Sequence, residues 1–513
     1  MRAKQTWIVA AVTLVSLVAH LWQLGLRPLA HDEAIDAWFS WQAGRGDVMR
    51  YDPVYHGPLR FYLEGPLLHL FGGGASWARL VAAVAGVAAT AIIASSRRTL
   101  GRVGAPVAAI VFTFSPTVLT VTRTGREDSL IALVSLGLIL VVAYILTHPT
   151  PLHIVSGGGL LATSWAIKET TFLLGFVALL FFIGVGLLAW RLPAGASRAA
   201  VLRVVALGRS PWTWSATAFL VVFMVVFTSG FRYPGGVQSG FLDGIKYWAS
   251  QHQVRRGGQP WFFYLTIYGA YEWLLIGLAT IGLAVSVHRR SMVGGWLGAM
   301  WLGQVAVYSW AGEKFAWLAL HPLVPAVLLA GIGAQTLYER FHAPAWRRAL
   351  AGALLVSVSL TAVVAIRPAI TDGADPGELL VTVQTSTDVP PIVERLRAGQ
   401  DTGSIKKILV DQRGGGSWPW AWYLNDFDGV AYVDVVNGQF PEGYDALILD
   451  GAIGPPVVPA GYTVEEFSLR RWWVPDYSSA TIADMARWLF TRKTWNPTGS
   501  YRQYLVIRAA AVP

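Results

Sequence analysis

The sequence predicts an all-α polytopic membrane bundle followed by a C-terminal α/β domain, and three observations support this prediction. The 513-residue chain is 54% hydrophobic and only 14% charged, which is too apolar for a soluble enzyme of this length. Apolar stretches of about 20 residues, enough to cross a bilayer core of about 30 Å, recur through the first 366 residues. After Arg367 the sequence becomes more polar and offers short strand-like runs instead.

We expect a transmembrane domain in residues 1–367 with about eleven helices, in which each apolar stretch forms one span. The first stretch resembles a signal peptide, but no small-x-small cleavage site follows it, so we expect an uncleaved span. The expected spans are 7–26, 77–96, 103–121, 129–146, 152–167, 171–190, 212–229, 261–287, 293–309, 323–338 and 349–366. Residues 368–513 are long enough to bury a core of their own, with strands near 405–410, 430–436, 446–449, 463–469 and 504–508 and a helix over 480–492.

Basic residues gather in alternate loops, and this bias predicts the orientation of the chain. If the N-terminus is cytoplasmic, the inner loops carry a single acid, Glu339. Their bases are Arg2, Lys4, Arg97, Arg98, Arg102, Arg191, Arg198, Arg203, Arg209, Arg289, Arg290, Arg340, Arg347 and Arg348. Bases in short loops mark the cytoplasmic side, so we expect a multi-pass plasma-membrane protein with an extracytoplasmic C-terminal domain. The net charge of +10 then serves lipid head groups rather than nucleic acid, and the absence of cysteine excludes disulfides and thiolate chemistry.

Most of the acids of the first 366 residues fall in loops on the opposite, outer side. The longest of these loops, 27–76, contains Asp32, Glu33 and Asp36. Asp32 and Asp36 are four residues apart and share one face of a helix, which we expect to be amphipathic, with its aromatic side in lipid. Asp32 would then lie at the membrane surface within reach of a lipid phosphate, although it could equally cap the helix. His56 follows in a turn, where an isolated histidine can be incidental.

Ionisable residues also lie in three further outer turns and at one position inside a span. Arg126-Glu127-Asp128 forms a tight turn in which Asp128 could cap the next helix, while a membrane-level Arg126 offers a planar fork for phosphate. Lys168-Glu169 could be a local ion pair. Glu313-Lys314 precedes His321, and Glu272 lies inside a predicted span, where an acid indicates function. Each site has a structural explanation, but their joint occurrence on one side indicates surface chemistry on a lipid-linked substrate.

The loops also resemble a known family. The first loop reads His31-Asp32-Glu33-Ala34 and then Tyr51-Asp52-Pro53-Val54-Tyr55-His56-Gly57-Pro58. It resembles the GT-C glycosyltransferases, and within them the protein O-mannosyltransferase and aminoarabinose-transferase-like branch. The later motifs at 126–128, 168–170 and 312–314 resemble the prokaryotic "flippase activity-associated" family of that branch. The resemblance covers residues 1–366, and the tail brings no motif of the family.

The resemblance implies transfer of a sugar, of the hexosyltransferase kind, from a polyprenyl-phosphate donor to a hydroxyl of a glycan, lipid or protein acceptor at the outer face. Asp32 would be the general base, a role that contributes roughly 10²–10⁴ in rate, and Glu33 would orient the acceptor. Arg126, Lys168 and Lys314 would stabilise the departing phosphate. The predicted substrate-binding residues are Tyr55, His56, Arg126, Glu127, Asp128, Lys168, Glu169, Glu272, Glu313, Lys314 and His321.

Several alternatives stay open at this level. No cofactor is certain, but some GT-C members hold a divalent metal, and Asp32 with Glu127 or Asp128 could bind Mg²⁺ or Mn²⁺. In the tail, the glycine-rich run 413–417 could be an anion-binding nest or a simple loop, and Trp418, Trp420 and Trp422 could stack on sugars or pack in a core. The alternative functions are a flippase or transporter of lipid-linked sugars, or its accessory, and a membrane-anchored assembly protein that acts through its tail.

Overall fold

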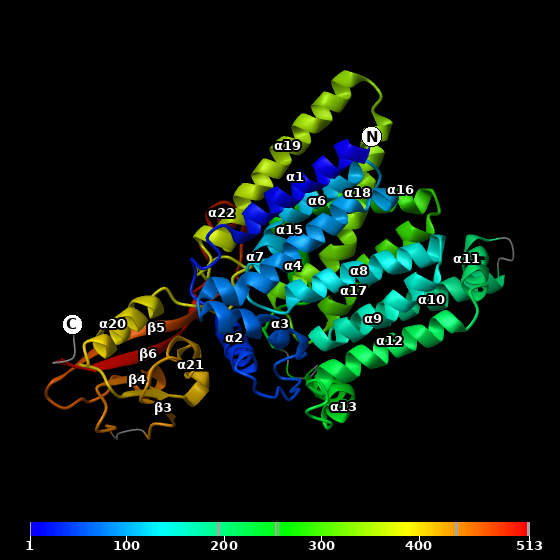
Figure 1. Ribbon diagram of the computed structural model, residues 1–513. Coiled ribbons are helices and arrows are strands. Elements are labelled where there is room, and N and C mark those ends of the chain that lie inside the picture. Colours follow the sequence, from blue (N-terminus) through cyan, green and yellow to red (C-terminus); the bar gives the residue numbers. More distant parts are fainter. Residues whose placement is uncertain (1, 192–194, 252–253, 255, 437–439, 510–513) are drawn as a thin grey trace.

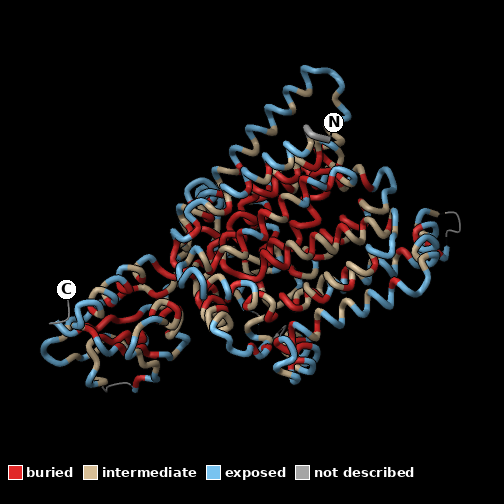
Figure 2. The backbone as a smooth tube through the Cα atoms, in the orientation of Figure 1, coloured by how far each residue is buried: buried red, intermediate tan, exposed pale blue. Residues whose placement is uncertain are grey.

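The computed structural model consists of a long helical bundle joined to a smaller domain built on one β-sheet (Figure 1). It describes residues 2–191, 195–251, 254, 256–436 and 440–509. The buried residues run through the centre of the bundle and along the middle of the sheet domain, while the outer helices of the bundle are largely exposed (Figure 2). In a membrane protein the exposed sides of such helices face lipid.

The bundle is formed by nine long helices and two bent pairs. The long helices are α1 (Arg2–Leu21), α4 (Ala75–Ser95), α8 (Asp128–Thr147), α9 (Pro151–Ile167), α10 (Thr171–Arg191), α12 (Ser210–Phe227), α17 (Met292–Trp310), α18 (Leu320–Arg340) and α19 (Pro344–Ile366). The pairs are α6 (Gly104–Thr113) with α7 (Pro116–Thr122), and α15 (Phe263–Tyr271) with α16 (Trp273–His288). The shorter connecting elements are α5 (Arg97–Leu100), α11 (Ala196–Val205), α13 (Gly236–Gln238), η1 (Ser239–Asp243), α14 (Gly244–Gln251), η2 (Ala316–Ala319) and η3 (Arg367–Thr371).

The predicted number of spans is not confirmed. Among the described residues, six helices are long and apolar enough to cross a membrane, or eight if each bent pair counts as one span. The other three expected spans, at α1, α9 and α17, are helical but shorter or less apolar. The pairs bend by 60° between α6 and α7 and by 104° between α15 and α16. Pro116 explains the first bend, because proline cannot continue the hydrogen-bond ladder of the preceding helix.

The first long loop forms α2 (His31–Gly44) and α3 (Leu59–Phe71), which pack on each other and on the end of the bundle. The helix expected at Asp32 is therefore confirmed, but its expected contact with lipid is wrong. Trp38 lies 6.5 Å from Trp418 of the C-terminal domain, measured between ring centroids, and Trp422 belongs to the same cluster. The buried carboxylates of α2, Glu33 and Asp36, determine how the helix is turned about its axis. Because they point into the bundle, the tryptophan side of the helix faces the sheet domain.

The C-terminal domain is a mixed six-stranded sheet with the strand order β1-β5-β6-β4-β2-β3. The neighbouring strands β4, β2 and β3 are parallel, with β3 at the edge of the sheet, and the other pairs are antiparallel. The five strands and the late helix expected from the sequence are confirmed, and β1 is additional. The elements are β1 (Gln384–Thr385), α20 (Val389–Asp401), β2 (Ile408–Asp411), η4 (Arg413–Gly415), α21 (Trp420–Tyr423), β3 (Val430–Val433), β4 (Ala446–Asp450), η5 (Gly451–Ile453), β5 (Tyr462–Trp472), α22 (Ile482–Thr491) and β6 (Gly499–Arg508).

The tryptophans of the tail serve packing. Trp420 is fully buried in the core of the sheet domain, and its Nε1 donates to Gln503 at 2.8 Å. Trp418 and Trp422 contact α2 instead of an open surface. The glycine-rich run forms the short turn η4, in which Arg413 pairs with Asp411. These contacts fix the sheet domain against the first loop, directly beside the ionisable residues of the bundle.

Candidate functional site

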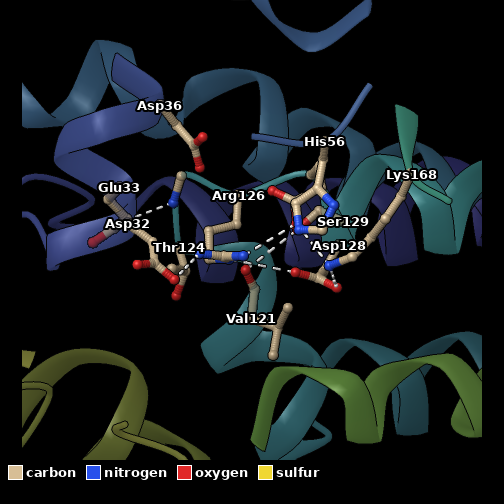
Figure 3. A network of polar contacts seen from close by, with 12 residues as sticks. Asp32, Glu33, Asp36, His56, Val121, Thr124, Arg126, Asp128, Ser129 and Lys168 are labelled. Carbon is tan, nitrogen blue, oxygen red and sulfur yellow. Dashed lines mark hydrogen bonds and ion pairs between the residues drawn. The ribbon is translucent and has the colours of Figure 1, made fainter. Parts of the chain in front are cut away.

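Charged side chains from several of the turns predicted to face outward lie side by side at one site (Figure 3). Residues far apart in the sequence are brought into one ionic network because the loops after α1, α7 and α9 meet there with the start of α18. The members, joined by hydrogen bonds and ion pairs, are Asp32, Asp36, Tyr51, His56, Arg60, Glu64, Arg126, Glu127, Asp128, Lys168, Glu169 and His321. Acids and bases alternate through this network, as charges buried this deeply must.

Asp32 is the exposed member of the network. Its side chain is 42% exposed, whereas most other members are nearly inaccessible. One carboxylate oxygen of Asp32 accepts a hydrogen bond from Nη1 of Arg126. Both residues line a cavity of about 200 Å³, together with Arg27 and Trp317. The carboxylate at position 32 is therefore both positioned by a cation and open to a ligand.

Glu33 has a different environment from its neighbour. It is fully buried, and Arg79 from α4 donates to both of its carboxylate oxygens at 2.8 and 2.9 Å. The backbone N–H groups of Ala30 and Gly125 donate to the same carboxylate at 2.8 and 2.6 Å. Burial raises the pKa of Glu33, but the guanidinium groups of Arg79 and Arg27 outweigh it and hold the pKa at about 2. Glu33 thus ties α2 to α4 and to the turn at Gly125, and it does not contact the cavity around Asp32.

The Arg126-Glu127-Asp128 turn forms the centre of the network. Arg126 lies between Asp32 and the two carboxylates, with Nη2 at 3.2 Å from Glu127 and Nε at 3.5 Å from Asp128. Its guanidinium also stacks on the ring of Trp317, at 4.6 Å from the ring centroid. This stacking and the three carboxylates fix the plane of the guanidinium at the wall of the cavity.

Lys168 neutralises the buried half of the turn. Its ammonium contacts Glu127 at 2.6 Å and Asp128 at 2.7 Å, and only 2% of its side chain is exposed. Burial lowers the pKa of Lys168, but Asp128 and Glu127 outweigh it and raise the pKa above its usual value. His321 completes the group with Nε2 at 2.9 Å from Asp128. Lys168 is thus committed to structural ion pairs and offers no edge to a ligand in this arrangement.

His56 extends the network to the other side. Its Nδ1 lies 2.9 Å from Glu169, its Nε2 lies 3.4 Å from Glu127, and its ring stacks on Trp248 at 5.3 Å. Burial lowers the pKa of His56, but Glu127 and Glu169 outweigh it, so the net shift is upward. Tyr51 donates its hydroxyl to the same Glu169. His56 therefore joins two loops across the network.

Arg60 on α3 lies close to three carboxylates. It pairs with Asp36, contacts Glu64 at 2.8 Å and lies 3.6 Å from Glu127. Burial raises the pKa of Asp36 to about 7, because Arg60 opposes it only in part and Glu127 raises it further. One guanidinium cannot fully compensate three buried anions, so Asp36 holds a proton over part of the neutral range.

Besides Glu33, four predicted site residues are not members of this network in the described part of the chain. Glu272 is buried at the bend between α15 and α16, where it accepts from the Ser115 hydroxyl and the Thr117 N–H, both at 2.8 Å. It therefore joins the two helix breaks. Tyr55 packs on Phe39 at 4.6 Å. Glu313 and Lys314 precede η2, and Lys314 lines a second cavity, described below.

The chain is similar to a known protein family over part of its length and to several solved structures. Residues 55–227 match the family model described as dolichyl-phosphate-mannose-protein mannosyltransferase. The solved structure of ArnT from Cupriavidus metallidurans bound to undecaprenyl phosphate matches 98% of this chain and 99% of its own, with a TM-score of 0.61 and 14% identity. Its apo form gives a TM-score of 0.59 at 16% identity, over 100% of this chain and 99% of its own.

The Archaeoglobus fulgidus oligosaccharyltransferase in its apo form matches 82% of this chain and 64% of its own, with a TM-score of 0.56 and 12% identity. Residues 55–227 thus match a glycosyltransferase family model, and the chain as a whole has the fold of these solved structures. No curated protein sequence matches the chain. At these identities the structural matches establish the GT-C fold, including the sheet domain, while the activity rests on the site itself.

A divalent metal does not fit this site as it is arranged. Asp32 and Asp128, the predicted ligands, face Arg126 and Lys168 instead of each other. Among the described residues, no group of three His, Asp or Glu side chains is placed to hold a metal ion. An ammonium and a guanidinium occupy the positions between the carboxylates, so cationic side chains already supply the positive charge that a metal would bring.

Two cavities adjoin each other at the site. The cavity around Asp32 shares Phe315 and the segment 381–383 as a wall with a larger cavity of about 490 Å³ between the bundle and the sheet domain. Lys314 and Arg470, from β5, both line this interface cavity. A third cavity of about 630 Å³ lies between α8, α9, α10 and α12, but no ionisable side chain lines it. Of these three cavities, only the first two are lined by ionisable side chains.

Arg470, like Arg60 and Glu64 in the network, is a site residue that the sequence did not indicate. Its Nη1 lies 3.1 Å from Nδ1 of His31, the residue preceding Asp32, and its Nη2 donates to the carbonyl of Gly415 at 3.1 Å. Burial and, next to it, the guanidinium of Arg470 together lower the pKa of His31 to about 4, so the neutral ring accepts this bond. Nothing in the local pattern of β5 separates Arg470 from Arg471. Arg79, in contrast, is a charge within a predicted span, which is a recognisable signal.

Proposed function

We propose that the protein transfers a sugar from a polyprenyl-phosphate donor to an acceptor hydroxyl, with Asp32 as general base. The observation that carries this proposal is the pairing of an exposed carboxylate with a fixed arginine at the mouth of a cavity. A general base must reach its substrate, and Asp32 combines that access with a position held by a protein cation.

The donor class follows from the surroundings of the site. The fold places the cavity at one end of a bundle of apolar helices, where the phosphate of a lipid anchored in the bilayer can reach Arg126. The relative from Cupriavidus metallidurans was solved with undecaprenyl phosphate bound, which makes a polyprenyl phosphate the natural first donor to test. We place this end of the bundle, and the sheet domain with it, at the extracytoplasmic face.

The reaction requires one proton transfer and one displacement. Asp32 takes the proton of the acceptor hydroxyl as the hydroxyl oxygen attacks the anomeric carbon. The bond from that carbon to the phosphate oxygen breaks, and the phosphate leaves with the electron pair. Arg126 donates hydrogen bonds to the oxygens of the leaving phosphate. When the guanidinium exchanges its hydrogen bond to Asp32 for one to the phosphate, the Asp32 carboxylate becomes free to contact the acceptor.

Two of the predicted roles change in this proposal. Lys168 and Glu33 both form buried ion pairs, so neither contacts the substrate in this proposal. Lys168 positions the turn that contains Arg126, and Glu33 positions α2. Lys314 and Arg470 line the adjoining interface cavity, which we propose as the entry for the acceptor. The tail then contributes to the site, because Arg470 belongs to the sheet domain.

The decisive experiment uses the full chain in proteoliposomes with a panel of polyprenyl-phosphate sugars and a membrane extract as the source of acceptors. Mass spectrometry follows the release of polyprenyl phosphate and the appearance of a product heavier by one sugar. The wild type and Asp47→Asn, a control on an exposed loop carboxylate, should both transfer. Asp32→Asn should not transfer at a measurable rate while folding normally.

Two results would reject the proposal. Sugar transfer by Asp32→Asn at the wild-type rate would show that the residue at position 32 is not the general base. Movement of the lipid-linked sugar across the bilayer without any transfer would instead identify the alternative function, a transporter of lipid-linked sugars.

A further inference from the structure

The short helix α22 (Ile482–Thr491) presents apolar side chains outward in a domain that is otherwise water-facing. Ile482 is 88% exposed and Phe490 80%, and Met485 and Leu489 are also exposed. At 3.6 residues per turn these four side chains fall within an arc of roughly 140°. The other large exposed hydrophobics among the described residues after 371 are valines on separate loops and strands. The arc on α22 is therefore a continuous apolar surface.

The opposite side of α22 is fixed to the membrane bundle. Trp488 is the one buried side chain of the helix, and its ring lies 6.3 Å from that of Tyr271 at the end of α15. Its Nε1 donates to the Gly377 carbonyl at 2.8 Å. Trp488 also belongs to the core cluster of the bundle, not to that of the sheet. The helix is thus held by the bundle, with its apolar arc turned away from it.

An ion-pair chain places α22 level with the end of a membrane span. Arg492, which ends α22, contacts Glu378 at 3.1 Å, and Arg367 at the end of α19 lies 3.5 Å from the same carboxylate. Only 11% of an apolar 18-residue stretch within the span containing α19, Pro344–Thr371, is buried, so its surface faces lipid. Figure 1 shows α22 beside this end of α19. The apolar arc therefore continues a lipid-facing surface.

Charges flank the arc as they do in interfacial helices. Arg487 and Lys493 are exposed beside it, and the chain as a whole carries a net charge of +10. Aromatic rings accompany the helix: Trp473 lies 5.9 Å and Trp495 6.2 Å from Trp488. Tryptophan and basic residues around an apolar helical face are typical of segments lying at the head-group level of a membrane.

We propose that α22 lies in the interface of the lipid bilayer, with Ile482, Met485, Leu489 and Phe490 among the acyl chains. The sheet domain is then attached to the membrane surface at one edge rather than free in solution. This attachment holds the interface cavity, to which Arg470 of the same domain contributes, at a constant height above the bilayer. The proposal does not depend on the activity of the enzyme.

The chain contains no cysteine, so single cysteines can be introduced without background labelling. Ile482→Cys and Phe490→Cys carry a nitroxide label on the arc. Val457→Cys is the matched control, because Val457 is 92% exposed in the same domain but away from α22. The full-length variants are reconstituted in vesicles containing anionic phospholipid. Power-saturation EPR then compares collisions with oxygen, which concentrates in lipid, and with a nickel chelate, which stays in water.

We expect the ratio of oxygen to nickel accessibility at positions 482 and 490 to exceed the ratio at 457 severalfold. Two independent positions on the arc protect the result against local disturbance by one substitution. Ratios equal to that at 457 would overturn the proposal, since the helix would then face water. Low accessibility to both reagents, with broadening from a second label nearby, would also overturn it, because a second copy of the chain would cover the arc.

Discussion

Adjacent carboxylates at positions 32 and 33 should give opposite phenotypes when each loses its charge. In Glu33→Gln the buried guanidinium of Arg79 keeps its charge but loses its anionic partner. Breaking a buried ion pair in this way costs about 3–5 kcal/mol. A carboxylate whose pKa falls from 4.5 to about 2 contributes on the order of 3 kcal/mol at neutral pH, which agrees. Asp32 is 42% exposed, so Asp32→Asn should cost less than about 1 kcal/mol.

The assay is thermal unfolding of the purified full-length protein in detergent, followed by tryptophan fluorescence. We expect the apparent midpoint of Glu33→Gln to fall clearly below that of the wild type, while Asp32→Asn stays near it. Glu33 has a lowered pKa, so its contribution is complete above pH about 4.5 and is lost as the pH falls through about 2. The gap between the wild type and Glu33→Gln should therefore narrow as the pH is lowered from about 5.

Two outcomes would refute this reasoning. A Glu33→Gln protein as stable as the wild type at pH 7 would mean that the contact with Arg79 contributes nothing to stability. A gap that stays constant down to pH about 3 would mean that the glutamate charge is not what the variant removes.

Three further predictions concern other parts of the site. Arg126→Ala should lower the rate of sugar transfer by about 10²–10³ through the loss of a donor to the leaving phosphate, and an unchanged kcat would contradict that role. Asp36 has its pKa raised to about 7, so the folded form loses stability as the pH rises from about 4 through 7. Asp36→Asn should flatten this decline in thermal midpoint, and an identical slope would be evidence against it. Arg470→Gln should raise the KM for the acceptor at least severalfold, whereas Arg471→Gln, which loses an exposed ion pair with Asp388, should not. Equal effects of the two would exclude a specific role for Arg470.

Much of the local structure followed from the sequence because the signals were local. The helix at Asp32, the strands of the tail and the helix over 480–492 all appear, since periodicity and strand-forming runs depend on neighbouring residues. The gathering of the charged turns also followed, because alternating loops of a bundle must lie on the same side. The number of spans was less certain, since bends such as the one at Glu272 depend on packing between helices.

The roles within the site depended on three-dimensional partners that no local pattern contains. Nothing in the sequence distinguishes the exposed Asp32 from the buried Glu33, because the difference comes from Arg79, 46 residues further along the chain. Lys168 is likewise a plausible phosphate ligand until Glu127 and Asp128 are seen on either side of it. Arg470 reaches the site only because the sheet domain packs against α2.

The most direct measurement compares the release of polyprenyl phosphate from a sugar-loaded donor by wild type, Asp32→Asn and Asp47→Asn in matched proteoliposomes. The account predicts release coupled to a glycosylated product for the wild type and Asp47→Asn, with a loss of at least about 10² in kcat for Asp32→Asn at normal stability. Equal release by all three proteins would contradict it, because the carboxylate at position 32 would then take no part in the reaction.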